Sequence, residues 1–230
     1  MTETFRIGFL LFPRLTQLDL TGPYEVLSRM PATETYLVAK SFDPVRADRG
    51  LAILPTTTLA TCPSLDLLCV PGGIGVNDVM TDDAWLAFIR RMAERARYVT
   101  SVCTGSLALA AAGVLKGKRA ACHWAARDAL RRLGAEPVDQ RVVIDGNRIT
   151  GGGVTAGIDF ALAIVDELHG RETAEAIQLM IEYDPHPPFD AGSPKRARPA
   201  VLARIKAMIE PFQRERDEAV RRAAAALAEN

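Results

Sequence analysis

Short apolar runs alternate with amphipathic stretches along most of this 230-residue chain. Continuous apolar runs that end at turn residues are typical of buried strands, and the clearest ones cover residues 7–12, 35–39, 65–70 and 98–102. Residues 82–97 instead have a helical period, with one apolar face formed by Trp85, Phe88, Ile89 and Met92. Strands that alternate with helices predict a mainly parallel sheet with helices on both faces.

The remaining pattern completes this alternation. We expect helices at residues 24–29, 106–114, 125–133, 156–169 and 173–182, the first of them opened by the sequence Thr-Gly-Pro at 21–23. A short strand is expected at 119–122, and a hairpin joins 141–145 to 148–150 through an Asp-Gly-Asn turn. Residues 50–58 are expected to form a hairpin-like pair of short segments around Pro55.

The carboxyl-terminal part has a different character. Residues 183–199 are rich in proline and poor in large apolar side chains, which predicts a loop or linker. Residues 200–229 return to a helical composition, and Pro211 is expected to break that helix in two. This tail is too short to form a core of its own. We therefore expect an α/β domain over residues 1–199 and a helical extension over 200–230 that packs on the domain or on a second subunit.

The charge balance excludes several classes of partner. Lys and Arg together number 28, as do Asp and Glu, so there is no basic surplus for nucleic-acid phosphates or anionic lipid. The amino terminus lacks the pattern of a signal peptide, and no apolar stretch approaches the length of a membrane span. We expect a cytoplasmic protein with no nucleic-acid partner and no membrane partner.

Cysteine and histidine spacing argues against a metal site. The cysteines show no CxxC spacing, and the histidines are scattered along the chain. The cysteines are Cys62, Cys69, Cys103 and Cys122, and the histidines are His123, His169 and His186. A zinc site or a disulfide framework is therefore not expected. We predict that the protein holds no metal and needs no cofactor.

Three glycine-containing motifs follow expected strands. They are Pro-Gly-Gly at 71–73, Cys-Thr-Gly at 103–105 and Gly-Gly-Gly at 151–153. Parallel sheets bind ligands outside the carboxyl ends of their strands. We expect Gly73, Ile74, Gly151, Gly152 and Gly153 to shape the substrate site or to bind a developing negative charge through their backbone.

Cys103 is the expected nucleophile. It follows a strand directly and precedes a small-residue helix, a placement that projects a side chain into a cleft from a sharp turn. The start of a helix is expected to lower the pKa of such a thiol. The other three cysteines are expected to be ordinary core residues.

The local sequence leaves the roles of two further residues open. Asp19 lies between two leucines, and it could either cap the following helix or exchange a proton with the Cys103 sulfur. Burial beside a thiolate would raise the pKa of Asp19 and allow it to donate that proton. His123 follows a strand, but nothing local indicates a contact with the sulfur.

Several stretches together resemble the ThiJ/PfpI superfamily of the glutamine-amidotransferase-like class. They span about residues 5–170 and read QLDLTGPYEVL, VPGG, YVTSVCTGSLALAAAGVL, GKRAACHWA and ITGGGVTAGIDFALAIV. The resemblance implies a flavodoxin-like, three-layer α/β sandwich, commonly a homodimer, with the nucleophile on a strained elbow. It assigns the nucleophile to Cys103 and the neighbouring acid to Asp19.

Within the superfamily the chain is most similar to the branch that hydrates isocyanides. The shared features are Asp19, the Cys103–Thr104 pair and the stretch QLMIEYDPHPPFDAGSP. The resemblance implies that an isocyanide and water give an N-substituted formamide through a thioimidate on Cys103, with Cys103, Asp19 and Thr104 as the catalytic residues.

Two alternatives remain open. Sensor domains of AraC-type regulators share the TGP, SVCTG, HW and TAGID motifs but continue into a helix-turn-helix domain, for which we expect no room here. A glyoxalase-type enzyme acting on small dicarbonyls is the other. Proteolysis is disfavoured, because PfpI-type proteases place a His after the nucleophile where this chain has Thr104.

Overall fold

A mainly parallel sheet forms the centre of the protein. The computed structural model describes residues 4–229, and within them the main sheet has seven strands in the order β10-β11-β7-β6-β1-β2-β5. Every neighbouring pair is parallel except β10 and β11, which form the expected hairpin. The strands are β1 (Phe5–Leu10), β2 (Thr33–Ala39), β5 (Thr57–Thr58), β6 (Leu67–Val70), β7 (Tyr98–Val102), β10 (Val142–Asp145) and β11 (Arg148–Gly151).

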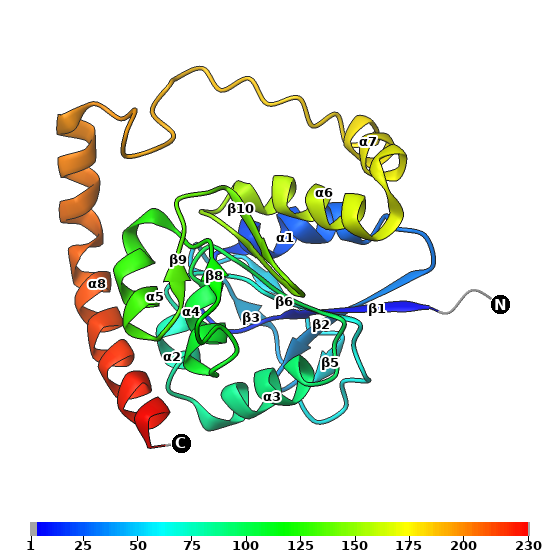
Figure 1. Cartoon of the computed structure of the whole chain (residues 1–230), viewed down its shortest axis with the longest axis horizontal. Helices are drawn as coiled ribbons and strands as arrows, with labels where there is room; N and C mark the ends of the chain where they lie inside the picture. Colours follow the sequence, from blue (N-terminus) through cyan, green and yellow to red (C-terminus); the bar gives the residue numbers. More distant parts are fainter. Residues whose placement is uncertain (1–3, 230) are drawn as a thin grey trace.

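Helices cover both faces of this sheet, which confirms the flavodoxin-like sandwich (Figure 1). Helices α1 and α6 pack together on one face, while α3 and α4 lie on the other. The helices are α1 (Gln17–Leu27), α2 (Val76–Val79), α3 (Asp83–Ala93), α4 (Gly105–Ala111), α5 (Arg127–Arg132), α6 (Ala156–His169), α7 (Arg171–Met180) and α8 (Pro199–Ala228). No helix in the described part of the chain is long and apolar enough to cross a lipid bilayer.

The apolar pattern explains which side chains form the core. All four residues of β6 are buried, as expected for a continuous apolar run covered on both sides. In α3 the four apolar residues predicted to share a face are all buried. Asp82 caps this helix by accepting hydrogen bonds from the N–H groups of Ala84 and Trp85.

Helix α1 begins earlier than predicted. It starts at Gln17 and continues through Pro23, so the prediction that Thr-Gly-Pro opens the helix is wrong. The proline ring packs against Gly157 of α6, where a Cβ atom would lie only 3.0 Å from Pro23 Cδ. Close packing of α1 on α6 therefore outweighs the local cost of a proline inside a helix.

Residues 50–58 do not form the predicted hairpin. Strand β4 (Ala52–Ile53) instead pairs antiparallel with β3 (Val45–Arg46), in a small separate sheet. Beyond Pro55 the chain changes partner, because the N–H of Thr56 donates to the carbonyl of Leu37 and β5 then pairs parallel to β2. A second small sheet joins β8 (Arg119–Ala120) to β9 (Glu136–Pro137).

The carboxyl-terminal helix α8 is a single helix. Residues 183–198 form neither helix nor strand, as predicted, and they arch over the molecule before α8 descends along α5, α4 and α2 (Figure 1). The predicted break at Pro211 is wrong. Pro211 and Ala207 are both exposed, so the carbonyl group freed at Ala207 can bond water, and packing of Val220 into the core holds the helix against the domain.

Candidate active site

The three glycine-containing motifs meet at one edge of the sheet. Strands β6, β7 and β11 are parallel neighbours, so their carboxyl ends lie side by side. The motifs at 71–73, 103–105 and 151–153 therefore lie next to one another in the backbone, where they were expected to shape a site. Asp19 reaches the same place from the first turn of α1.

Cys103 occupies a strained elbow between β7 and α4. Its φ angle is +57°, in the left-handed region that a residue with a Cβ atom rarely adopts. Its N–H group donates to the carbonyl groups of Gly152, at 2.8 Å, and Gly151, at 3.2 Å. On the other side, a Cβ atom at Gly105 would lie 2.1 Å from the carbonyl oxygen of Val70. Close backbone packing on both sides therefore holds the elbow in this conformation.

The pKa of the Cys103 thiol is raised well above its ordinary value, not lowered as the sequence suggested. Burial is the main cause, since Cys103 is only 5% exposed, and the charge of Asp19 adds to it. The N–H groups of Thr104 and Val154 interact with the sulfur and act in the opposite direction. Helix-start donors are thus present, but desolvation and the neighbouring carboxylate outweigh them.

Asp19 is completely buried. Burial raises the pKa of its carboxyl group from 3.8 to about 7, while the Cys103 thiol and the N–H of Gly72 lower it. Neither carboxyl oxygen makes a well-aligned hydrogen bond with any described residue. Asp19 is not the helix cap, because Thr16 occupies that position and Asp19 lies within the first turn.

Gly72 allows the two side chains to approach each other. A Cβ atom at this position would lie 2.7 Å from Asp19 Oδ2 and 2.8 Å from Cys103 Cβ. It would also lie 2.6 Å from the backbone nitrogen of Thr104. The absence of a side chain at Gly72 is therefore a condition for this arrangement, although the sequence pointed to Gly73 rather than to Gly72.

Thr104 and Gly73 bind each other. The N–H of Gly73 donates to Thr104 Oγ1 at 2.9 Å, and that hydroxyl group donates to the Gly73 carbonyl at 3.1 Å. The Gly73 N–H is therefore already engaged, so this arrangement favours the expected role of Gly73 in shaping the site over binding of a developing negative charge. Ile74 is half-buried at the next position. The hydroxyl of Thr104 positions the loop that carries Gly72.

The Gly-Gly-Gly motif provides carbonyl groups to the elbow and leads to an N–H donor. The carbonyl groups of Gly151 and Gly152 accept from the Cys103 N–H, and Val154, which the sequence did not indicate, directs its N–H at the sulfur. A backbone N–H group cannot be recognised from the type of residue that carries it. Only the position of Val154, in the loop that follows a strand, could have indicated this donor. Gly153 packs against a ring, since a Cβ atom there would lie 2.8 Å from Cδ2 of His123.

His123 holds the elbow through its backbone, and its ring forms part of the wall of a cavity beside the elbow. Its N–H donates to the Cys103 carbonyl at 3.4 Å, and its Nδ1 accepts from the N–H of Ala125 at 3.3 Å. Burial, together with the charges of Arg216 and Arg127, lowers its pKa from 6.5 to about 4. The ring is therefore uncharged near neutral pH.

The other cysteines have a different environment from Cys103. Burial raises the pKa to about 12 for Cys69 and Cys122 and to about 11 for the half-buried Cys62. Cys103 is in direct contact with the carboxyl group of Asp19, and none of the other three cysteines has such a contact with an acid in the described part of the chain. Within residues 4–229, no group of three or more His, Cys, Asp and Glu side chains is arranged to hold a metal ion.

A cavity of about 490 Å³ adjoins the elbow. Its wall includes Gly152 and Val154, which contact Cys103 directly, and the ring of His123. The rest of the lining comes from Cys122, Trp124, the start of α5, the loop before β10, residues 153–156 and residues 192–195. A volume of this size accommodates a small organic molecule.

Several known proteins are similar to this chain in sequence. Isonitrile hydratase from Pseudomonas putida is 56% identical over 222 residues, which cover 96% of this chain and 97% of that protein. The HTH-type transcriptional regulator GbdR from Pseudomonas aeruginosa is 32% identical over 77% of this chain but only 50% of the regulator.

A solved structure and a family model agree with these matches. The crystal structure of a ThiJ/PfpI family protein from Pseudomonas syringae superposes with a TM-score of 0.92 at 47% identity, covering 95% of this chain and 91% of that one. The model of the DJ-1/PfpI family matches residues 5–167. This chain therefore belongs to the DJ-1/PfpI family.

Proposed function

We propose that this protein adds water to an isocyanide, R–N≡C, to give an N-substituted formamide. The observation that carries the proposal is the buried acid–thiol pair, in which Asp19, with a pKa of about 7, lies against Cys103 on a strained elbow. The similarity to an isonitrile hydratase over nearly the whole of both chains supports the same reaction, because isonitrile is another word for isocyanide.

The first step forms a bond between sulfur and carbon. Asp19 takes the proton of the Cys103 thiol, so that the single negative charge of the pair moves to the sulfur. The thiolate attacks the terminal carbon of the isocyanide, and Asp19 returns its proton to that same carbon. The product is a thioimidate, Cys103–S–CH=N–R, and Asp19 is again a carboxylate.

The second step releases the formamide. Asp19 removes a proton from water as the oxygen attacks the thioimidate carbon, and it passes that proton to the nitrogen. The tetrahedral intermediate collapses when Asp19 accepts the hydroxyl proton and the sulfur departs as a thiolate. One carboxyl group therefore serves as acid and base in turn, and a pKa of about 7 suits both roles near neutral pH.

The backbone around the elbow supports these steps. The N–H groups of Thr104 and Val154 lower the pKa of the Cys103 thiol and so stabilise the thiolate. The Thr104 hydroxyl, through Gly73, keeps the loop with Gly72 in place. Thr104 is therefore a positioning residue for the acid–thiol pair as well as a backbone donor.

Turnover by the purified protein tests the proposal. We expect a simple alkyl isocyanide to be converted to its formamide, and the Cys103→Ala variant to have no activity. Conversion of methylglyoxal instead would identify a glyoxalase-type enzyme. Binding of a small molecule without turnover of either compound would favour a ligand or redox sensor. Activity should persist after chelator treatment and dialysis, because the reaction is redox-neutral and needs neither a metal nor an organic cofactor.

We also propose that the protein acts as a cytoplasmic homodimer. Apolar side chains remain largely exposed on α7 and the segment after it, where Leu179 is 81%, Met180 71% and Phe189 80% exposed. A surface of this kind is typical of a subunit contact. Light scattering at micromolar concentration should give twice the monomer mass, and a monomer would contradict the proposal.

A further inference from the structure

The cavity beside Cys103 has no assigned ligand. The peptide segment from Gly152 to Val154 lines one part of it, and residues 192–195 of the arching segment line another. The ring of Trp124 offers it an apolar surface. Gly152, which accepts from the Cys103 N–H, and Val154, whose N–H is directed at the sulfur, connect the cavity wall to Cys103, and we take the cavity as the space for the R group of a bound isocyanide.

Its charged lining is unbalanced. Among the residues that the structure places around the cavity, the cations are Arg127, Arg141 and Lys195, and the only carboxylate is Asp139. Arg141 pairs outside the lining with Asp159, at 2.5 Å. Two cations thus remain for a single carboxylate.

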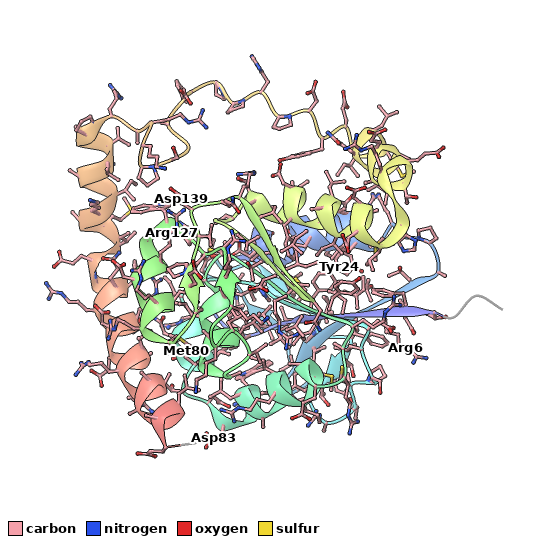
Figure 2. The ribbon with its side chains drawn as sticks, in the orientation of Figure 1. Arg6, Tyr24, Met80, Asp83, Arg127 and Asp139 are labelled. Carbon is pink, nitrogen blue, oxygen red and sulfur yellow. The ribbon has the colours of Figure 1, made fainter. Side chains whose placement is uncertain are left out.

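Arg127 and Lys195 share that carboxylate. Arg127 lies 2.5 Å and Lys195 2.8 Å from the oxygens of Asp139, and both cations lower the Asp139 pKa. Figure 2 shows Arg127 and Asp139 beside each other, below the loop that leads into α8. One positive charge therefore stays uncompensated at the wall of the cavity.

Two further observations indicate a positive site. The buried Nε–H group of Arg127 has no hydrogen-bond partner among the described residues, and the same is true of the Nε–H group of Arg216, whose charge acts on His123 in the cavity wall. An unpaired guanidinium donor is costly in a buried position. The His123 ring, on the same wall, has its pKa lowered first by burial and then by these two arginines.

We infer that the cavity binds an anionic R group, and that the favoured substrates are isocyanides with a carboxylate. The inference rests on the proposed function. Arg127 and Lys195, which share the one carboxylate of the lining, supply positive charge for the carboxylate of the substrate, and Trp124, also in the lining, contacts the carbon chain. A planar guanidinium group matches a carboxylate in geometry and charge.

A matched pair of substrates tests this inference. Isocyanoacetate and its methyl ester differ mainly in charge, so the ratio of their kcat/KM values reports on the cationic wall. We expect a preference for the carboxylate of about tenfold, which is typical of one charge-assisted hydrogen bond at a partly exposed site. Added salt should reduce the preference.

Variants assign the preference to particular residues. Arg127→Gln should lower kcat/KM for isocyanoacetate about tenfold and change the value for the ester less than twofold. Lys195→Gln, at an exposed position, should give a smaller loss of about threefold and provides a second test if Arg127→Gln fails to fold. The control is Arg132→Gln on the same helix, because Arg132 pairs with Asp217 outside the cavity and should not affect either substrate.

A binding measurement separates this inference from the proposed function. N-formylglycine is the expected product from isocyanoacetate, and calorimetry should show that it binds more tightly than its methyl ester. Equal turnover of the two isocyanides, with equal binding of the two products, would overturn the inference and leave the proposed function intact. If no isocyanide is turned over, the proposed function fails, and the binding comparison alone decides whether the cavity is an anion site.

Discussion

Asp19 and Cys103 meet at Gly72, in a place where neither side chain has ready access to water. Asp19 is 0% exposed and Cys103 is 5% exposed. Burial makes ionisation of both groups harder, and a charge on Asp19 raises the pKa of the Cys103 thiol further, whereas the thiol as a donor favours the Asp19 carboxylate. The pair is therefore suited to carry one negative charge that moves between oxygen and sulfur as a proton passes between them.

Replacement of Asp19 by Asn should abolish turnover while the fold is retained. An amide has nearly the shape of a carboxyl group, but it cannot donate and recover a proton. General acid–base catalysis typically contributes about 10²–10⁴-fold, so a loss of at least that size is expected in steady-state assays. Circular dichroism and the melting temperature serve as controls for folding, and an active, folded Asp19→Asn variant would contradict the role of Asp19.

The same substitution should change how stability depends on pH. The carboxyl group titrates near pH 3.8 when unfolded and near pH 7 when folded. Between these values the folded protein binds more protons than the unfolded chain, so this group makes the free energy of unfolding fall as pH rises. The loss is about 1.4 kcal/mol per pH unit at most, and a few kcal/mol in all.

Asn at position 19 does not titrate, so the variant should lack this loss. The margin between its melting temperature and that of the parent protein should therefore shift in favour of the variant from pH 4 to pH 7 and then become constant. The comparison isolates Asp19 because all other titrating groups are common to both proteins. A margin independent of pH would show that the Asp19 pKa is not raised in the folded state.

Much of the fold could be predicted from the sequence because it depends on local pattern. The extents of β7 and α6 match the expected residues, and the strand-end motifs around Gly72, Cys103 and Gly151 come together because parallel strands end at the same edge. Such features depend on apolar periodicity and turn residues, which can be read directly along the chain.

Features that depend on tertiary packing could not be predicted in this way. The proline residues Pro23 and Pro211 are strong local signals for helix boundaries, yet packing on α6 and on the domain keeps both helices continuous. The direction of the Cys103 pKa shift was predicted wrongly because depth of burial is not visible in the local sequence. Gly72 and Val154 were missed because they contribute space and a backbone N–H.

Gly72→Ala should impair catalysis by separating the acid from the thiol. The new methyl group would lie less than 3 Å from Asp19 Oδ2 and from Cys103 Cβ, so at least one of these groups must move. We expect kcat/KM to fall about a hundredfold, in line with the effect of a displacement of about 1 Å. The control is Gly22→Ala on α1, where the nearest atom to the new Cβ would lie 3.5 Å away and activity should be retained.

The covalent intermediate should form on Cys103 alone. Rapid quenching of the enzyme during turnover of excess isocyanide should reveal, by mass spectrometry, an adduct with the mass of the substrate on the peptide that contains Cys103. Cys103→Ser should be far slower, because a hydroxyl group ionises poorly near neutral pH and Asp19 is a weak base for it. Cys62 is the informative control: it is the most accessible of the other three cysteines, but it has no acid beside it. Cys62→Ser should therefore retain full activity, and an adduct on any cysteine other than Cys103 that accompanies loss of turnover would refute the assignment of the nucleophile.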